Sequence, residues 1–344
     1  MERTAIVILN WNGRKHLEEF LPSVVSNSPT CDIIVIDNYS SDDSVAFLKE
    51  NYPKIELIHN KENGGFAKGY NDGLKQIKSK YEYYVLLNSD VEVTKNWVEP
   101  IISMLDLDKT IAACQPKVLA YKSKEKFEHA GACGGFMDIN GYPFCRGRQF
   151  SYVEKDENQY NNPREIFWAT GACMFVRVEA FQKLEGFDED YFAHMEEIDL
   201  CWRMKLQGMK IMVNPQSTVY HLGGGTLNYL SPRKVYLNFR NSLFTLYKNY
   251  TGKYLFLKIL WRMMLDYVAF FKFVVQGDFK ASIQVFKAQK DFFIGFKKMR
   301  IKRKKIHLES TDFNPIGIYK KSIVFSVYIQ KKTKFSDLEE KDFY

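Results

Sequence analysis

Short runs of consecutive apolar residues alternate with helical spacings along the first 120 residues of the chain. Such runs are typical of strands buried on both faces, and they fall at Thr4–Leu9, Asp32–Ile36, Ile55–Ile58 and Tyr83–Leu87. The segments between them predict helices over Arg14–Ser26, from Ser41 to about Asn51, and from Asn63 to about Lys80. This alternation predicts an α/β fold with a mostly parallel sheet flanked by helices.

The pattern changes beyond residue 120. The stretch 120–164 is rich in Gly and Lys and has no clear periodicity, so we expect a loose insertion. Apolar runs return at Phe167–Val176, Ile211–Val213 and Ser217–His221. After Ser231 the spacing is helical to about Lys298, and a basic, mixed tail follows.

Polar side chains follow the strands of this predicted sheet. Asn10 and Asn12 come after the first strand, Asp37 and Asn38 after the second, and Asn88 after the fourth. The carboxyl ends of parallel strands meet at one edge of a sheet, and ligands bind at that edge. An acidic residue such as Asp37 can accept hydrogen bonds from a ribose or a base. The alternative is that its loop only caps the next helix.

The Gly-rich segment Asn63–Asn71 opens the third helix. Backbone N–H groups near Gly64, together with the cation of Lys68 and the amide of Asn71, could approach a diphosphate. The alternative is a helix start that packs closely on the sheet. The segment is not the GxGxxG fingerprint, so it does not indicate dinucleotide binding.

Two residues are candidate metal ligands. Asp90 ends the loop Asn88-Ser89-Asp90, where a carboxylate could hold Mg²⁺ or Mn²⁺ against substrate phosphates, or could serve only the turn. His221 ends a strand just before the three glycines 223–225. An imidazole there could bind a transition metal such as Mn²⁺, although a lone His is more often a structural residue.

A cluster of carboxylates is predicted at the start of a helix. Glu196, Glu197 and Asp199 lie within four residues of one another. Acidic residues are favoured at helix N-termini, so a capping role is one interpretation. The other is a general base, because neighbouring carboxylates repel and raise the pKa of one of them toward the working pH.

Composition excludes several classes of protein. Hydrophobic residues make up 46% of the chain and charged residues 26%, a balance that excludes a disordered chain. The net charge is +8, but Thr251–Ser310 alone holds 14 basic and 4 acidic residues, so the remainder sums to about −2. We therefore expect no nucleic-acid partner. Six scattered cysteines and no apparent export signal lead us to expect reduced thiols in a cytoplasm.

The basic excess follows an amphipathic segment. In Tyr254–Gln276, the residues Lys258, Arg262, Asp266 and Lys272 fall in one stripe about 120° wide, and the rest is largely apolar. Downstream, Lys297–Lys305 has seven cations in nine residues. We expect a helix in the interface of an anionic membrane, with the basic run on the headgroups. The alternative is a helix packed on the catalytic domain.

The order of these motifs resembles that of family 2 glycosyltransferases with the GT-A fold, and most of all that of bacterial rhamnosyltransferase-like members. The resemblance covers about residues 4–225 and rests on seven motifs. They are Asn-Trp-Asn-Gly, IDNYSSDDS, NGGFAKGYNDG, LLNSD, WATGACMF, GFDEDYFAHMEEIDLCWR and VYHLGG. This resemblance implies a catalytic domain over residues 1–230, with a donor half about 1–120 and an acceptor half about 121–230. Residues 231–300 would then be a helical, membrane-interfacial segment, and residues 301–344 a basic tail.

The resemblance also implies roles for individual residues. Asp37 is similar to the family's contact to the base or ribose, and Asp90 to its metal-binding Asp, although Asn88 departs from the first Asp of that motif. His221 matches a histidine that completes the metal site in some members. Glu196 and Glu197 resemble the acidic pair whose second member is the catalytic base, here Glu instead of the commoner Asp. The acceptor border would comprise Trp168, Thr170, Gly171 and Asp199.

The expected activity is an inverting, metal-dependent transfer from a nucleotide-diphospho-sugar, such as dTDP-rhamnose or a UDP-sugar. The acceptor would be a saccharide or polyprenyl-linked saccharide in cell-surface polysaccharide synthesis, with the enzyme peripheral on the inner face of the plasma membrane. Two alternatives are a sugar-nucleotide nucleotidyltransferase and a non-catalytic module that binds nucleotide-sugars or lipid surfaces. The chain lacks the Gly-rich loop that a nucleotidyltransferase would carry after the first strand. The set Asp37, Asp90, Glu197 and His221 argues against the non-catalytic module.

Overall fold

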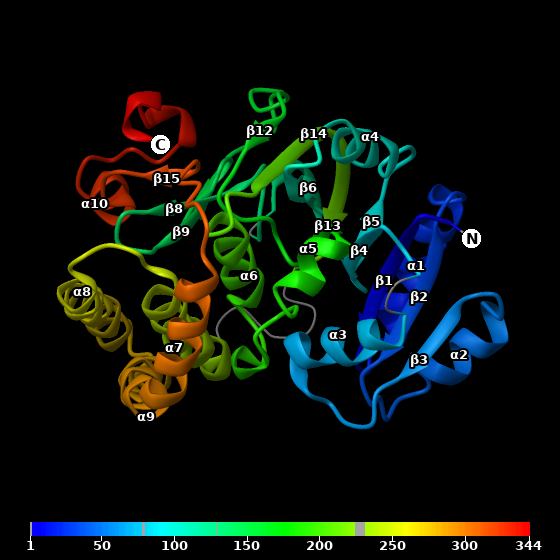
Figure 1. The fold of residues 1–344 in the computed structure, drawn as a ribbon, viewed down its shortest axis with the longest axis horizontal. Helices are drawn as coiled ribbons and strands as arrows, with labels where there is room; N and C mark the ends of the chain where they lie inside the picture. Colours follow the sequence, from blue (N-terminus) through cyan, green and yellow to red (C-terminus); the bar gives the residue numbers. More distant parts are fainter. Residues whose placement is uncertain (1, 78–79, 129, 224–230) are drawn as a thin grey trace.

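The structure, a computed structural model, describes residues 2–77, 80–128, 130–223 and 231–344. Its centre is a mixed sheet with the strand order β12-β14-β6-β13-β4-β1-β2-β3, on which β5 pairs with β14 and β7 with β6 (Figure 1). The strands are β1 (Thr4–Asn10), β2 (Asp32–Asp37), β3 (Glu56–His59), β4 (Tyr83–Asn88), β5 (Val91–Val93), β6 (Ile111–Ala120), β7 (Ser123–Phe127), β12 (Arg164–Glu165), β13 (Cys173–Arg177) and β14 (Lys210–His221).

The parallel, doubly covered half of this sheet confirms the predicted α/β architecture. Strands β4, β1, β2 and β3 are parallel neighbours, and β13 then runs antiparallel to both β4 and β6. On β1, Ile6 and Ile8 pack into the cluster on the side of α1 and α4, while Ala5 and Val7 pack on the side of α3. The helices of this domain are α1 (Arg14–Asn27), α2 (Ser44–Asn51), α3 (Gly65–Gln76), α4 (Glu99–Leu107), α5 (Val178–Lys183) and α6 (Glu196–Lys205).

The stretch 120–164, expected to be a loose insertion, instead builds most of a second sheet. Its strands are β8 (Gly135–Asp138), β9 (Pro143–Cys145), β10 (Arg148–Gln149), β11 (Tyr152–Val153) and, from the far end of the chain, β15 (Ile318–Tyr319). The expected basic tail is therefore folded. After β15 come α10 (Ile323–Tyr328) and the rings of Phe335 and Phe343, which lie 4.8 and 5.5 Å from the ring of Phe136 on β8.

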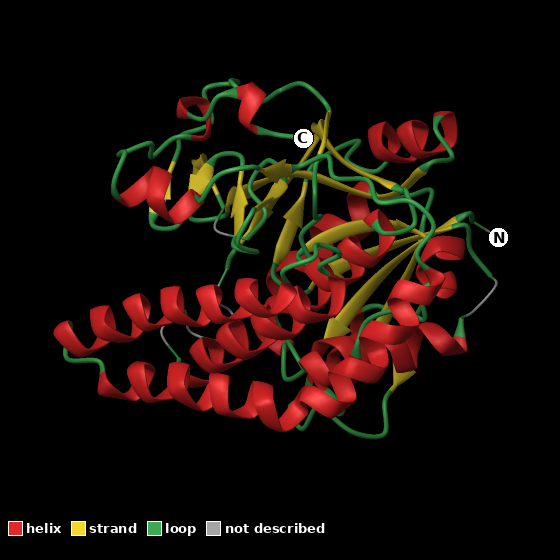
Figure 2. Ribbon diagram, turned by 60° about the vertical axis from the view of Figure 1, so that its left-hand side comes forward, coloured by secondary structure: helices red, strands yellow, loops and turns green. Residues whose placement is uncertain are grey.

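Three helices occupy the region where helical structure was expected. They are α7 (Pro232–Asn249), α8 (Leu255–Val275) and α9 (Phe279–Glu309), so the expected boundary at residue 300 falls inside α9. Gly277, with φ of 75°, lies in the short turn from α8 to α9. The two long helices form a hairpin that extends to one side of the sheets (Figure 2). Within the described residues, none of the helices combines the length and apolar character that crossing a membrane requires.

Candidate active site

The first two strands end side by side at the predicted ligand edge. Asn10 and Asp37 are register partners, and Asn10 Nδ2 donates to Asp37 Oδ1 at 3.2 Å. Asn12 Oδ1 accepts from the backbone N–H of Ser41 at 2.7 Å, which fixes the loop after β2. At the start of α2, the side chain that accepts the backbone N–H of Ser44 belongs to Asp42. Asp37 Oδ2 also accepts the backbone N–H of Ser40 at 3.2 Å, so Asp37 orders its own loop.

The Gly-rich start of α3 is built around Asn38. Asn38 Nδ2 donates to Asn63 Oδ1 at 3.0 Å and to the carbonyl of Gly65 at 3.1 Å, while Asn38 Oδ1 accepts from Asn60 Nδ2 at 3.0 Å. Asn38 is thereby committed to holding the loop that contains Gly64. The sequence interpretation missed Asn60, although it lies just after the third strand as Asn38 does after the second.

Two further residues that were expected to contact the nucleotide-sugar instead bond to other parts of the protein. Lys68 pairs with Asp72 on the next turn of α3 and with Glu62 at 3.3 Å, and the hydrogen bond to Asp72 raises the pKa of the Lys68 ammonium. Asn71 Nδ2 donates to the carbonyl of Phe187 at 2.8 Å, and Asn71 Oδ1 accepts the backbone N–H of Phe187 at 3.0 Å. Asn71 thus joins α3 to the segment that leads into α6.

The two predicted metal ligands come together from distant parts of the chain. His221, at the end of β14, places Nε2 3.2 Å from Asp90 Oδ1 and 3.5 Å from Asn88 Nδ2. Its Nδ1 lies 3.4 Å from Oε2 of Glu128, a buried residue that sequence reasoning missed. Gly224 and Gly225, expected to give a ligand room beside His221, lie outside the described residues.

This pair fits a divalent cation. Asp90 would offer a carboxylate oxygen and His221 an imidazole nitrogen, both of which are ligands for Mn²⁺, from two segments that meet at 3.2 Å. Glu128 takes the outer position that commonly orients a metal-bound imidazole. Among the described residues, no three His, Cys, Asp or Glu side chains are arranged to hold a metal ion. Asp90 and His221 would therefore need phosphate oxygens and water to complete the coordination.

Burial and charge oppose each other at His221. Burial alone would lower the pKa of the imidazole, but Asp90 and Glu128 together raise that pKa to about 10. Burial likewise raises the pKa of Asp90, but the charge of His221 outweighs it and leaves this pKa below its usual value. Without an ion the pair is thus an imidazolium and a carboxylate. A cation that binds Nε2 must displace a proton.

A row of neighbouring residues links this pair to the other predicted site residues. A Cβ atom added to Gly13 would meet Asn10 Oδ1 at 2.4 Å and Ser89 Oγ at 3.6 Å, so the loops after β1 and β4 lie side by side. The backbone N–H of Asn88 donates to the carbonyl of Ala172 at 3.0 Å. Its neighbour Gly171 faces α6, since a Cβ added there would lie 3.7 Å from the Cβ of Glu197.

The loop before α6 has an unusual backbone. Phe192, His194 and Met195 all have positive φ, between 65° and 74°, which costs free energy for residues other than Gly. Two elements hold the loop in this conformation. The backbone N–H of Phe66 on α3 donates to the carbonyl of Phe192 at 2.6 Å. From α7, Asn241 Nδ2 donates to the carbonyls of Tyr191, Ala193 and His194 at 3.0, 3.0 and 2.7 Å.

This loop presents Glu196 and Glu197 at the N-terminus of α6. Oε2 of each is buried and lacks a hydrogen-bond partner among the described residues. Burial raises the pKa of Glu197 to about 7. Burial, together with the charge of Glu197, raises the pKa of Glu196 well above its usual range. Of the two carboxyls, Glu197 is therefore the one whose pKa lies near neutral pH.

Asp199, two residues on, has the opposite environment. It is buried, but Lys248 Nζ, Arg203 Nε and Asn249 Nδ2 lie at 2.9, 2.9 and 2.8 Å from its oxygens. Burial by itself would raise the pKa of Asp199, but Lys248 and Arg203 lower it below the usual value. These donors occupy the carboxylate that was expected to contact the acceptor.

The other predicted acceptor residues line the same region, mostly beneath the surface. Trp168 is buried and donates from Nε1 to the carbonyl of Phe136 at 2.9 Å. Thr170 is buried too, and its backbone N–H donates to Gln115 Oε1 at 3.0 Å. Gly171 alone of the three is partly exposed, between Phe66 and Glu197.

Comparison with known proteins places this site in a family. The model for glycosyl transferase family 2 matches residues 5–185, more than half of the chain. The chain belongs to this family. The glycosyltransferase is 23% identical over 231 residues to an N-acetylglucosaminyl-diphospho-decaprenol L-rhamnosyltransferase of Mycobacterium tuberculosis, covering 63% of this chain and 75% of the relative. It is 24% identical over 228 residues to rhamnosyltransferase WbbL of Escherichia coli, covering 63% and 82%.

Solved structures agree on the fold. A mannosyltransferase from Pyrobaculum calidifontis, in complex with GDP-Man and Mn²⁺, superposes with a TM-score of 0.53 at 13% identity, covering 89% of this chain and 86% of that one. The glycosyltransferase therefore has the GT-A fold that its motifs indicated.

Proposed function

We propose that this glycosyltransferase moves a sugar from a nucleotide-diphospho-sugar to a saccharide hydroxyl, with divalent-metal assistance and inversion at the anomeric carbon. The row of neighbouring residues that runs from Asp37 through Asn88 to Glu197 carries the proposal. It brings together a carboxylate suited to a ribose or base, a pair suited to a cation, and a carboxyl that ionises near neutral pH. Family membership supports the same reaction class.

On the donor side, Asp37 would accept hydrogen bonds from the nucleoside at the end of β2. Asn10 and Asn12 hold the loop around it, while Asn38, Gly64 and Asn71 shape the start of α3 near the diphosphate. Asp90 and His221 would hold Mg²⁺ or Mn²⁺. When bound, that ion would neutralise the charge that develops on the departing diphosphate.

On the acceptor side, Glu197 would remove the proton from the attacking hydroxyl. The residue is partly exposed, its Oε2 lacks a partner among the described residues, and its raised pKa suits a base that works near neutral pH. We assign no covalent role to the enzyme, so a single displacement would invert the configuration of the sugar. Gly171 would give the acceptor access beside Glu197.

The donor would be dTDP-rhamnose or a UDP-sugar, and the acceptor a saccharide or polyprenyl-linked saccharide at the inner face of the plasma membrane. Two rhamnosyltransferases among the relatives support the rhamnosyl donor. The relative from Mycobacterium tuberculosis is named for a decaprenol-linked sugar, which supports a lipid-linked acceptor.

A panel of UDP-, dTDP- and GDP-sugars tests this proposal. We expect one donor to raise the melting temperature only when Mn²⁺ or Mg²⁺ is present, and to release its nucleotide when an acceptor is added. Tight binding of every effective donor in the presence of a chelator would contradict the metal assignment. Release of pyrophosphate from a sugar phosphate and a nucleoside triphosphate would indicate a nucleotidyltransferase instead.

A further inference from the structure

Helix α8 is packed with its polar side inward. Arg262 and Asp266, two of the four residues of the predicted polar stripe, are 3% and 0% exposed, while Lys272 at its other edge is exposed. Arg262 Nε donates to Asp266 Oδ1 at 3.0 Å, Arg262 Nη1 donates to the carbonyl of Gly141 at 2.8 Å, and the Tyr142 hydroxyl donates to Asp266 at 3.0 Å. The polar stripe thus serves as the attachment to the second sheet.

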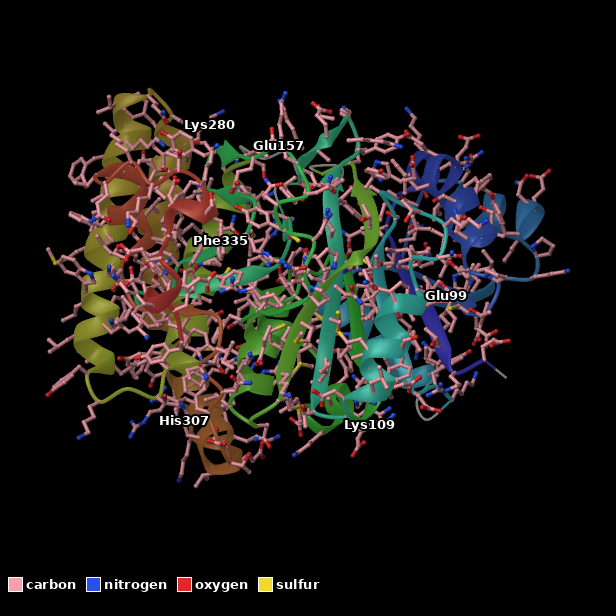
Figure 3. The ribbon with its side chains drawn as sticks, turned by 90° about the horizontal axis from the view of Figure 1, so that it is seen from above. Glu99, Lys109, Glu157, Lys280, His307 and Phe335 are labelled. Atoms are coloured by element: carbon pink, nitrogen blue, oxygen red, sulfur yellow. The ribbon has the colours of Figure 1, made fainter. Side chains whose placement is uncertain are left out.

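The apolar side of α8 is consequently left uncovered. Its exposed side chains include Phe256, Trp261, Met264, Val268, Phe271 and Val275. In Figure 3 this helix forms one edge of the molecule, and its side chains project away from the sheets. A contiguous apolar face of this length is unusual on a protein surface in water, and it marks a site of contact.

Helix α9 adds a second exposed stripe of mixed character. Phe279, Ile283 and Phe286 recur at helical spacing along it. Lys290, Lys297 and Lys304, seven residues apart, continue the same line and are exposed. Figure 3 labels Lys280 and His307 near the two ends of this helix.

The charges on the hairpin favour an anionic partner. Between Thr251 and Ser310, Glu309 is the one acidic residue with an exposed side chain. Of the other three, Asp266 is buried against Arg262, Asp278 caps α9 by accepting from Ala281, and Asp291 accepts from the hydroxyl of Tyr236 at 2.6 Å. The docking face, meaning the exposed apolar side of α8 with the stripe of α9, therefore presents apolar groups and cations.

The hairpin is fixed to the catalytic domain by the other cations of the basic run. Lys298 and Lys302 pair with Asp190, and Lys302 also pairs with Asp188, in the segment just before the strained loop. Arg303 Nη1 donates to the carbonyls of Tyr247 and Tyr250 at 2.7 and 2.8 Å. The expectation that the whole run Lys297–Lys305 rests on headgroups is corrected for Lys302 and Arg303, which are partly buried against the protein, while Lys298 and Lys305 pair with Asp190 and Glu185 and stay exposed.

We propose that the docking face lies in the interface of an anionic bilayer, with the apolar side of α8 among the acyl chains and the α9 lysines at the phosphates. A second copy of the chain fits the face less well, because a symmetric contact through α9 would bring its lysines against one another. This inference deepens the proposed function by naming the surface through which the enzyme meets its membrane. Its test requires no turnover.

Vesicle binding tests the charge component. We expect the full chain to co-sediment with phosphatidylcholine vesicles that contain 30% phosphatidylglycerol, and more weakly with phosphatidylcholine alone or at high salt. The variant K290Q/K297Q/K304Q should lower the partition coefficient on the order of 100-fold, from the loss of three cations near the anionic surface. The control K49Q/K54Q/K109Q removes equal charge at exposed positions on the other half of the molecule and should bind like the native protein.

Fluorescence tests the apolar component. Trp261 lies on the exposed side of α8, so lipids brominated in the acyl chains should quench the emission of the bound protein, and W261F should abolish most of that quenching. A native protein that stays in the supernatant at low salt, or a Trp261 that brominated lipid does not quench, would overturn the proposal. So would a concentration-dependent dimer that retains its association in the presence of vesicles.

These outcomes are separable from the proposed reaction. Nucleotide release with a water-soluble acceptor measures transfer without a membrane, so loss of vesicle binding alone would overturn the docking face and leave the transferase assignment intact. Circular dichroism of each variant confirms that the fold is retained.

Discussion

Replacement of Glu197 by Gln should slow the enzyme and stabilise it at the same time. The variant keeps the size of the side chain but cannot accept a proton. A positioned general base contributes ~10²- to 10⁴-fold, so we expect kcat to fall by at least ~10²-fold while donor affinity barely changes. In the native enzyme, kcat/KM should rise about tenfold per pH unit below pH 7 and level off above it, since burial raises the pKa of Glu197 to about 7.

The gain in stability follows from the same pKa. Relative to the ordinary value of 4.5, a folded-state pKa of about 7 means that the folded protein holds this proton more tightly than the unfolded chain does. The contribution of Glu197 is therefore fully present below pH 4.5 and is lost as the pH rises through 7. A difference of 2.5 pKa units corresponds to a free energy of unfolding on the order of 3 kcal/mol. Because Gln cannot ionise, Glu197→Gln removes this loss of stability at high pH.

The assay is urea unfolding of both proteins at pH 4.5 and pH 8, alongside steady-state kinetics. We expect similar midpoints at pH 4.5 and a more stable variant at pH 8. Asp199→Asn is a matched control on the same helix, because Asp199 is ion-paired and its loss leaves Lys248 and Arg203 without their partner. It should destabilise at pH 8, by ~3–5 kcal/mol. An active Glu197→Gln enzyme, or one no more stable at pH 8, would refute this reasoning.

Three further predictions concern the metal pair, the stereochemistry and the strained loop. Asp90→Ala should abolish the dependence of donor binding on Mn²⁺. Glu128→Gln should lower the affinity for Mn²⁺ ~10- to 100-fold without abolishing Mn²⁺ binding, which calorimetry can measure. NMR of the product should show the anomeric configuration opposite to that of the donor, and retention would exclude a single displacement. Asn241→Leu removes the two N–H donors that three loop carbonyls share, so it should cost ~2 kcal/mol in unfolding free energy and lower kcat more than it raises KM. An unchanged kcat would show that the loop needs no such support.

The parts of the fold that were predictable are those with local periodicity. Strands such as Thr4–Asn10 and Asp32–Asp37 are buried on both faces, so their apolar runs were unambiguous. The second sheet was missed because its strands are only two to four residues long and its partner β15 lies over 160 residues away in sequence. Short strands with distant partners leave no periodic signal for the sequence to display.

The residues of the candidate site also differ in how far the sequence could predict them. Residues at the strand ends, such as Asp37 and Asp90, could be found because the fold class says where such ends meet. Glu128 and Asn241 could not, because neither lies in a motif, and each acts only through contacts that the folded chain creates. Likewise, the spacing of α8 identified two faces but not which would be buried. That choice depends on Gly141 and Tyr142, more than 110 residues earlier, which hydrogen-bond the Arg262–Asp266 pair.

The acidic segment before and within α6 shows how one residue type takes two roles. Asp188 and Asp199 are buried beside Lys248, and this cation outweighs their burial and lowers the pKa of each. Glu196 is buried and Glu197 partly buried without such a partner, and the pKa of each rises. The paired carboxylates stay charged and hold α7 and α9 against this segment. Those ion pairs hold the segment that leads into the loop before α6, and the loop presents the unpaired carboxyls at the N-terminus of α6, where the pKa of Glu197 lies near 7.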